Sequence, residues 1–246
     1  EIMRLLFDNR ASRILYNFLS SNEFEKPFIL PCNVCEVIPA VFDEAEVKFV
    51  YLDIDPTTLC LNLDWVLNHV HVFSGVLFVH TYGIEKDFSD SFKRIKESNP
   101  EFVTIDDRCL CLPSFNNREE SIDLTLYSVG EKKQVDLGRG GFAFVRNSLS
   151  YHICALKADS FMNDSNWEVD IDLFGERVKQ SVDHRNRINA IYRKLLPKEI
   201  QLDDVFQNWR FNILVDDKEK IIRALFANGL FASSHYLPKA DGPCFS

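Results

Sequence analysis

The chain has 246 residues, 46% of them hydrophobic, and carries 28 basic against 37 acidic residues, a formal net charge of -9 at pH 7. This composition allows a large buried core, while the acidic excess and the lack of a Lys/Arg cluster exclude a nucleic-acid backbone as the expected partner. No stretch approaches the roughly 18 apolar residues needed to cross a bilayer, and the N-terminus lacks the order of a signal peptide, so we expect a cytoplasmic protein without a membrane segment.

Six short apolar runs, bounded by Pro, Asp or Gly, predict strands that are buried on both faces. They are FILPCNV (28–34), VKFVYLDID (47–55), GVLFVHTYG (75–83), FVTIDD (102–107), LTLYSV (124–129) and GFAFV (141–145). Helical patterns alternate with them at 9–19, 63–70 and 88–98; we expect Asp8 to cap the first helix, and Asp87 or Ser89 the last. The alternation predicts an α/β fold with a mostly parallel central sheet flanked by helices.

The pattern changes after residue 146. A polar stretch leads to a helix expected around 174–195, then to a strand at 209–215 and a helix at 217–227 that ends at Gly229. We therefore expect three parts, the last of them incomplete in this chain. They are a large domain over 1–150, a connecting segment over 151–175 and a smaller α+β domain over 176–246.

The chain has seven cysteines, an odd number in a sequence without a secretory signal, so we expect free thiols in a reducing compartment. Cys32 and Cys35 have the spacing of zinc ligands, but no second pair follows at that spacing. Buried free cysteine is common as a small hydrophobic residue, and we expect no metal site.

Polar residues follow several predicted strands, at the edge of the sheet where α/β proteins bind ligands. Asp107 ends the fourth run, and Ser128, Lys132 and Lys133 follow the fifth. A carboxylate and a lysine at neighbouring strand ends suit pyridoxal phosphate (PLP), whose ring nitrogen needs a carboxylate and whose aldehyde needs an amine. A lysine amine forms a Schiff base only when neutral, a form that desolvation or a neighbouring cation favours. The phosphate would take Ser128 and the N-terminus of the helix that starts near Asn9.

These residues also have purely structural interpretations. Lys132 and Lys133 would form a solvated turn, and the aspartates at 106 and 107 would be turn or capping carboxylates. His80 is interpreted as a core histidine held by a backbone carbonyl, and we leave it out of the site.

Several stretches resemble, in order, motifs of the DegT/DnrJ/EryC1/StrS family of sugar aminotransferases. They are NRAS (9–12), LPCNVCEVIPAVF followed by VKFVYLDIDPTTLCLN, VHTYGIEKD, IDD (105–107), YSVGEKKQVDLGRGGF, WRFNILV and GLFASSHYLP. Each stretch alone is a weak signal, but their order and spacing together are specific. The resemblance implies an aspartate-aminotransferase-like fold of type I, a large domain over 1–150 that binds PLP, and a homodimer with its sites at the interface.

The resemblance also implies a role for each matched residue near the cofactor. The family lysine falls five residues after Ser128, on Lys133, which would form the Schiff base and carry protons. Asp107 would pair with the pyridine nitrogen, and Ser128, Asn9 and Arg10 would hold the phosphate. Lys132 is expected to face solvent.

Other matched positions concern the ring face and the substrate. Cys35 stands where many family members stack an aromatic ring on the cofactor, and Leu110 stands where they carry a glutamine. His235 and Tyr236 would lie near the substrate.

The activity that the resemblance implies is transfer of an amino group, with glutamate as donor, to a keto group of a nucleotide-linked sugar. One alternative is a PLP-dependent sugar dehydratase or lyase, which the retained Lys133 disfavours because family dehydratases have histidine there. Another alternative is a non-catalytic binding protein on the same fold, which Leu110 and Cys35 favour.

Overall fold

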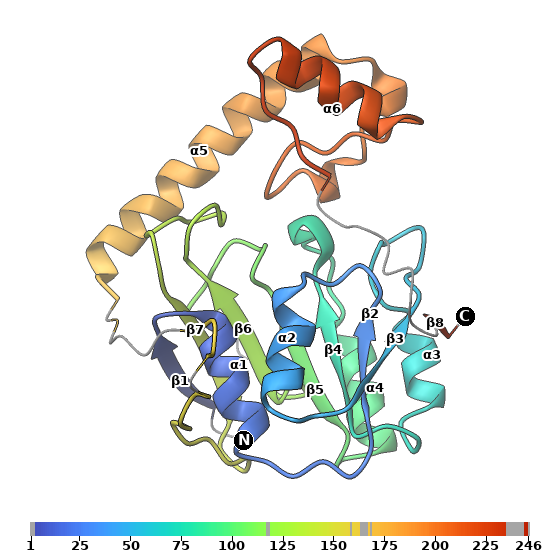
Figure 1. The fold of residues 1–246 in the computed structure, drawn as a ribbon, viewed down its shortest axis with the longest axis vertical. Helices are drawn as coiled ribbons and strands as arrows, with labels where there is room; N and C mark the ends of the chain where they lie inside the picture. Colours follow the sequence, from blue (N-terminus) through green and yellow to red (C-terminus); the bar gives the residue numbers. More distant parts are fainter. Residues whose placement is uncertain are drawn as a thin grey trace.

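The computed structural model describes residues 3–116, 119–157, 159–162, 167, 169–234 and 244–245. Its centre is an eight-stranded sheet in the order β1-β7-β6-β5-β4-β2-β3-β8 (Figure 1). The strands are β1 (Met3–Asp8), β2 (Phe28–Pro31), β3 (Phe49–Leu52), β4 (Gly75–Val79), β5 (Val103–Asp107), β6 (Leu124–Ser128), β7 (Gly141–Arg146) and β8 (Cys244–Phe245). The six predicted strands are thus present, each in shorter or nearly equal form.

The sheet is mixed. Neighbours from β8 through β3, β2, β4 and β5 to β6 pair in parallel, whereas β7 is antiparallel to both β6 and β1. Strand β1 was not predicted, because its apolar run is only three residues long and its pairing partner β7 lies far along the chain.

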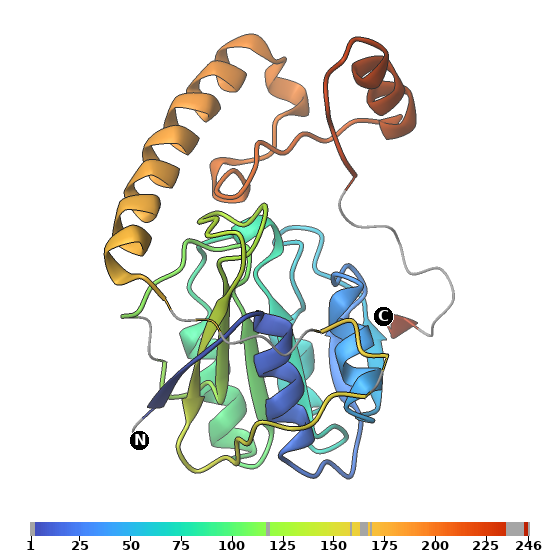
Figure 2. The same cartoon turned by 60° about the vertical axis from the view of Figure 1, so that its left-hand side comes forward.

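Helices cover both faces of the sheet (Figures 1 and 2). One face packs on α1 (Ala11–Ser20) and α2 (Val37–Glu44), and the other on α3 (Leu63–Asn68) and α4 (Ser89–Ser98). Side chains of β4 alternate between the two cores, since Leu77 belongs to the first, and Val76 and Phe78 belong to the second. This two-sided burial explains why the strands read as continuous apolar runs.

Helix α1 begins differently from the prediction. Asp8 remains in β1 and its Oδ1 accepts a hydrogen bond from the Asn9 amide at 2.7 Å, so Asp8 does not cap the helix. Arg10 is the N-cap, in extended conformation and without a capping side-chain bond. The amide groups of the first turn therefore lack a side-chain acceptor from the N-cap.

A strap over residues 149–157 holds α1 against the sheet. Arg13 is 1% exposed and its Nη2 donates to the Cys154 carbonyl at 2.8 Å; Tyr16 Oη donates to the Ala155 carbonyl at the same distance. Asn17 accepts from the Cys154 amide at 3.0 Å. These bonds satisfy polar groups of a helix whose other side is core, and they fix where its N-terminus points.

The C-terminal part consists of α5 (Ile171–Leu195), α6 (Lys218–Ala227) and connecting turns, and α5 rises from the sheet in both views (Figures 1 and 2). The strand predicted at 209–215 is wrong: within it only Ile213 forms an isolated bridge, to Gln201. The Gln207 side chain instead bonds the Leu202 and Asn212 carbonyls, and Trp209 is buried. Gly229 does follow α6, with φ of 71°, as predicted for a helix stop.

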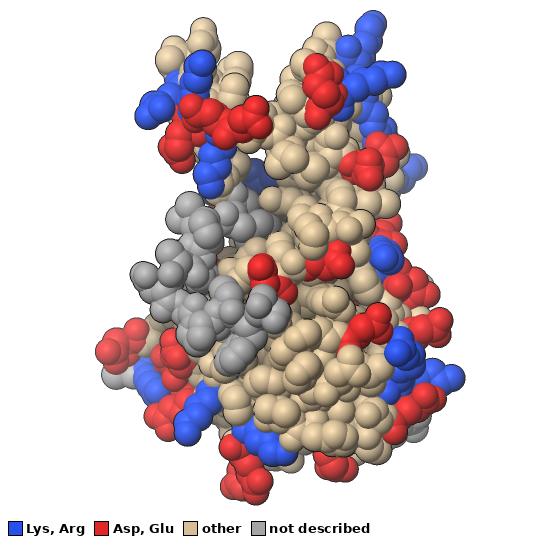
Figure 3. All heavy atoms as spheres, turned by 90° about the vertical axis from the view of Figure 1, so that its right-hand side faces the viewer, with Lys and Arg blue, Asp and Glu red and all other residues tan. Residues whose placement is uncertain are grey.

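Among the described residues, none of the helices combines the length and apolar character needed to cross a membrane. The side of the molecule that lies to the right in Figure 1 shows acidic and basic side chains interspersed among other residues (Figure 3). The described residues visible on this side form no continuous basic patch of the kind that binds a nucleic-acid backbone.

Candidate active site

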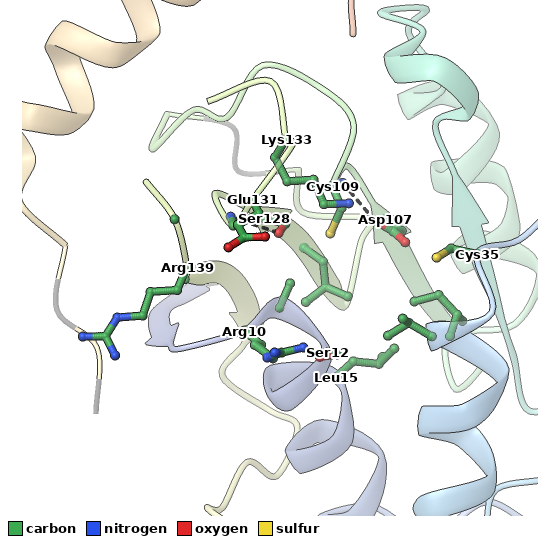
Figure 4. Close-up of a pocket in the computed structure, with 17 residues that line it drawn as sticks. Arg10, Ser12, Leu15, Cys35, Asp107, Cys109, Ser128, Glu131, Lys133 and Arg139 are labelled. Carbon is green, nitrogen blue, oxygen red and sulfur yellow. Dashed lines mark hydrogen bonds between the residues drawn. The ribbon is translucent and has the colours of Figure 1, made fainter. Parts of the chain in front are cut away.

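A cavity of about 380 Å³ lies where β5 and β6 end and α1 begins. Figure 4 shows its lining side chains converging from these elements and from the loop between β6 and β7. The lining residues are Arg10, Ala11, Ser12, Leu15, Cys35, Val37, Ile38, Asp107, Cys109, Leu126, Ser128, Gly130, Glu131, Lys133, Gly138, Arg139 and Gly140. The site is at the carboxyl ends of parallel strands, where the sequence places it.

The two adjacent lysines diverge. Lys133 is half-buried and lines the cavity, and its amine points toward Cys109 and Asp107 (Figure 4). Lys132 is exposed, with its carbonyl accepting from Trp209 Nε1 at 2.9 Å. A tight turn causes the divergence: the Lys133 amide donates to the Gly130 carbonyl at 3.2 Å, and Lys132 has φ of 64°. The solvated-turn interpretation therefore applies to Lys132 and not to Lys133.

Asp107 reaches the cavity because side chains alternate along β5. It is 7% exposed, and its Oδ1 accepts from the Cys109 amide at 2.9 Å. The preceding Asp106 points to the opposite side. Lys133 and Asp107 thus present an amine and a buried carboxylate to one cavity.

Asp106 forms a buried charged network behind the site. Its Oδ1 lies 2.9 Å from His80 Nε2 and its Oδ2 2.6 Å from Arg108 Nε, and both Asp106 and His80 are 0% exposed. Burial alone would raise the pKa of Asp106, but His80 and Arg108 outweigh it and hold that pKa below its usual value. The capping interpretation of Asp106 is wrong, because its partners are the side chains of His80, which follows β4, and Arg108, which follows β5.

The interpretation of His80 as a core histidine held by a backbone carbonyl is confirmed, since its Nδ1 lies 2.8 Å from the Ile84 carbonyl oxygen. Its Nε2 contact with Asp106 was not predicted. The network anchors the end of β5 to the end of β4, where the His80 amide also donates to the Asp107 carbonyl at 3.1 Å.

The opposite end of the cavity is the N-terminus of α1. Arg10, Ala11 and Ser12 line it, and half-buried Ser128 faces them from β6. Strand β7 presses against this turn, because a Cβ on Gly141 would lie 2.5 Å from the Ala11 amide nitrogen. Free amides and the helix dipole make such a turn suited to an anion such as a phosphate.

Asn9 lies beside the cavity rather than in its lining. It is 2% exposed, its amide donates to Asp8 and its carbonyl accepts from the Gly140 amide at 2.8 Å. These bonds tie the start of α1 to the start of β7. Ala11 and Ser12, which the sequence reasoning did not select, occupy the lining instead.

Cys35 lines the cavity from the loop before α2 and is exposed. Leu110 is 9% exposed and stays outside the lining, with its carbonyl against Gly83. His235 and Tyr236 lie outside the described residues.

Cys109 is a lining residue that the sequence reasoning missed. Its thiol is drawn beside the end of the Lys133 side chain (Figure 4). Burial, reinforced by the Asp107 charge, raises the pKa of this thiol well above the usual value, although Lys133 opposes this. Its position two residues after Asp107 was the available signal. Within the described part of the chain, no group of three or more His, Cys, Asp or Glu could hold a metal ion.

The fold is similar to solved aminotransferase structures. PseC of Helicobacter pylori, an aminotransferase involved in the biosynthesis of pseudoaminic acid, matches with 14% identity and a TM-score of 0.70 over 97% of this chain and 74% of its own. A DegT DnrJ EryC1 StrS aminotransferase from Brucella abortus matches with 13% identity and a TM-score of 0.68, over 98% and 73%. The sugar aminotransferase CalS13 from Micromonospora echinospora matches with 15% identity and a TM-score of 0.63, over 93% and 73%.

No protein-family model and no curated protein sequence matches the chain. The resemblance predicted from the motifs is thus confirmed at the level of the fold, which is the α/β fold of PLP-dependent aminotransferases of the DegT/DnrJ/EryC1/StrS type.

Proposed function

We propose that this protein is a PLP-dependent aminotransferase that transfers an amino group from glutamate to a keto group of a nucleotide-linked sugar. The observation that carries the proposal is that Lys133 and the buried Asp107 face one cavity whose far end is the N-terminus of α1. The proposal includes the type I fold, a large domain over 1–150, a segment over 151–175, a smaller domain over 176–246, and a homodimer.

The lining residues fit PLP. A cavity of about 380 Å³ suits a small flat cofactor, and it offers an amine, a buried carboxylate and a helix N-terminus on different sides. Gly141 packs closely against Ala11, and the turn at the start of α1 keeps its position only because residue 141 has no side chain. When bound, the cofactor supplies an electron sink that stabilises negative charge at the substrate carbon.

Each lining residue has a distinct task in this proposal. Lys133 would bind the aldehyde of the cofactor through its Nζ, and the same amine would carry the proton at the substrate carbon. Asp107 keeps the ring nitrogen protonated, and the Cys109 amide fixes the orientation of its carboxylate at 2.9 Å. Arg10 and Ser128, with the first amides of α1, bind the phosphate.

Further tasks concern the ring face and the substrate. Cys35 borders the ring face, and Asn9 supports the phosphate turn through its bonds to Asp8 and Gly140. His235 and Tyr236 contact the substrate in this proposal.

Titration of the purified protein with PLP tests the proposal. We expect an absorbance band near the visible edge that borohydride removes, and addition of glutamate should shift the band and release 2-oxoglutarate. A nucleotide keto-sugar should then restore the band and gain the mass of an amino group in place of the keto oxygen. PLP binding without any response to glutamate would instead support the dehydratase, and failure to bind PLP would support the non-catalytic binding protein.

Replacing Gly141 with alanine should weaken PLP binding about tenfold, equal to about 1.4 kcal/mol. The new Cβ would lie 2.5 Å from the Ala11 nitrogen and 2.7 Å from its Cα, so the start of α1 must move. The dissociation constant for PLP, measured by absorbance, checks this. Gly175→Ala is the control, because a Cβ there meets no atom within 4 Å. Equal affinities in the two variants would contradict the placement of the phosphate.

A further inference from the structure

Two arginines form a basic cluster next to the loop over 129–140 between β6 and β7, which carries Lys132 and Lys133 and which we call the lysine loop. They are Arg185 on α5 and Arg210 in the turn after Trp209. The Arg210 guanidinium lies 4.4 Å from the centre of the Trp209 ring. Trp209 in turn donates through Nε1 to the carbonyl of Lys132, the neighbour of Lys133. Trp209 therefore connects Arg210 to the loop that carries the proposed catalytic amine.

The periodicity of α5 places Arg185 on the helix face that lies toward the lysine loop and the turn around Trp209. Ser181 bonds the Gln134 carbonyl in the lysine loop, and Asn189 Nδ2 donates to the Gln207 carbonyl at 2.8 Å. Residues four apart share a helix face, so Arg185 lies between these two contacts. Both views show the turn before α6 above the loop between β6 and β7 (Figures 1 and 2).

Among the residues that the structure describes, no ion pair compensates the charge of the cluster. The Arg185 Nε is buried and has no hydrogen-bond partner, and among the described residues no carboxylate lies within 4.0 Å of either guanidinium. Burial lowers the pKa of Arg185, and the nearby Arg210 lowers it further, against a smaller opposing effect of Tyr192. Two like charges held together in a partly desolvated place cost free energy, which a bound anion would recover.

We infer that Arg185 and Arg210 form an anion subsite that binds a phosphate or carboxylate group of a substrate. Arginine suits this task because its planar donors bind such groups in pairs and stack on an aromatic ring. Through Trp209 the cluster contacts Lys132, the residue before the cavity-lining Lys133, so the subsite lies beside the proposed active site. That the anion belongs to a substrate rests on the proposed function, whereas anion binding itself does not.

Calorimetric titration of the full chain tests the inference without any catalytic readout. One arm uses a nucleoside diphosphate and the other uses glutarate, a non-reactive dicarboxylate related to the amino donor. We expect one of them to bind, and Arg185→Gln and Arg210→Gln each to weaken it at least about tenfold, as loss of a desolvated charged hydrogen bond does. Binding in the first arm assigns the diphosphate of the sugar nucleotide, and binding in the second assigns the donor carboxylate.

Arg187→Gln is the matched control. Arg187 is exposed on the same helix, so its replacement should leave the affinity for the anion unchanged. Arg185→Lys keeps the charge without the paired donors and should weaken binding less than Arg185→Gln. Circular dichroism of every variant verifies the fold. The inference is overturned if neither anion binds the wild type, or if the bound anion binds Arg185→Gln and Arg210→Gln as tightly as wild type. Anion binding that depends on Arg185 in a protein that does not take up PLP would sustain the subsite and refute the proposed function.

Discussion

Replacing Lys133 with alanine should abolish the borohydride-sensitive absorbance band and lower the aminotransferase rate at least about 10²-fold, the lower end of the range for a positioned proton carrier. The reason is that Lys133 is the cavity-facing lysine, and its amine points toward Asp107 (Figure 4). Absorbance after PLP addition and single-turnover transfer from glutamate measure the two effects.

Lys132→Ala is the matched control, because it removes the same charge from the adjacent position. Lys132 is exposed and contacts Trp209 and Asp136 only through its backbone carbonyl and amide, which alanine retains. This variant should keep the band and most of the rate. A band that persists in Lys133→Ala and is lost in Lys132→Ala would reverse the assignment of the two lysines.

Replacing Asp106 with asparagine should lower the free energy of unfolding by about 3–5 kcal/mol at pH 7, as expected when one partner of a buried ionic network is removed. Arg108 and the fully buried His80 would lose the carboxylate that both contact. Urea unfolding of wild type and variant measures the difference. Asp64→Asn is the control: its pair with Arg94 is mostly exposed, and its loss should cost less than about 1 kcal/mol.

The pH dependence of this effect has a definite sign. Because the folded protein holds the pKa of Asp106 below its usual value, the carboxylate contributes stability above the unfolded pKa of about 3.9. That contribution is lost as the pH falls through the lower pKa of the folded state. The difference between wild type and Asp106→Asn should therefore shrink below about pH 4. A difference that grew on acidification would contradict the ionic network.

Local sequence patterns predicted the strands and the helix α1 that position the cavity, but not α2, which lines it through Val37 and Ile38. The six apolar runs became β2 to β7, because burial on both faces requires uninterrupted apolar side chains. The missed strand β1 and the wrongly predicted strand at 209–215 depend instead on contacts with residues outside the local pattern. Pairing with β7 recruits a short run into the sheet, and the Gln207 side chain occupies backbone groups that a strand would need.

The chemistry of the candidate site could be predicted in part from the sequence. An aspartate ending one strand and a lysine following the next predicted one shared ligand site, because parallel strands end at the same edge. The partner of Asp106 was not readable, since His80 meets it only through the pairing of β4 with β5. Cys109 and the Arg185 and Arg210 cluster were likewise beyond local patterns, because their neighbours come from distant loops and from α5.

The sequence by itself determined the α/β alternation and the polar residues at the strand ends, since hydrophobic period is a local property. The choice of Lys133 over Lys132 is what the family resemblance implies, through the spacing of its lysine after Ser128. Only the tertiary structure decided the direction of β7, the opposite orientations of Asp106 and Asp107 toward their partners, and the approach of α5 to the lysine loop. These features depend on contacts between residues far apart in the chain, where packing and hydrogen bonding across elements outweigh local preference.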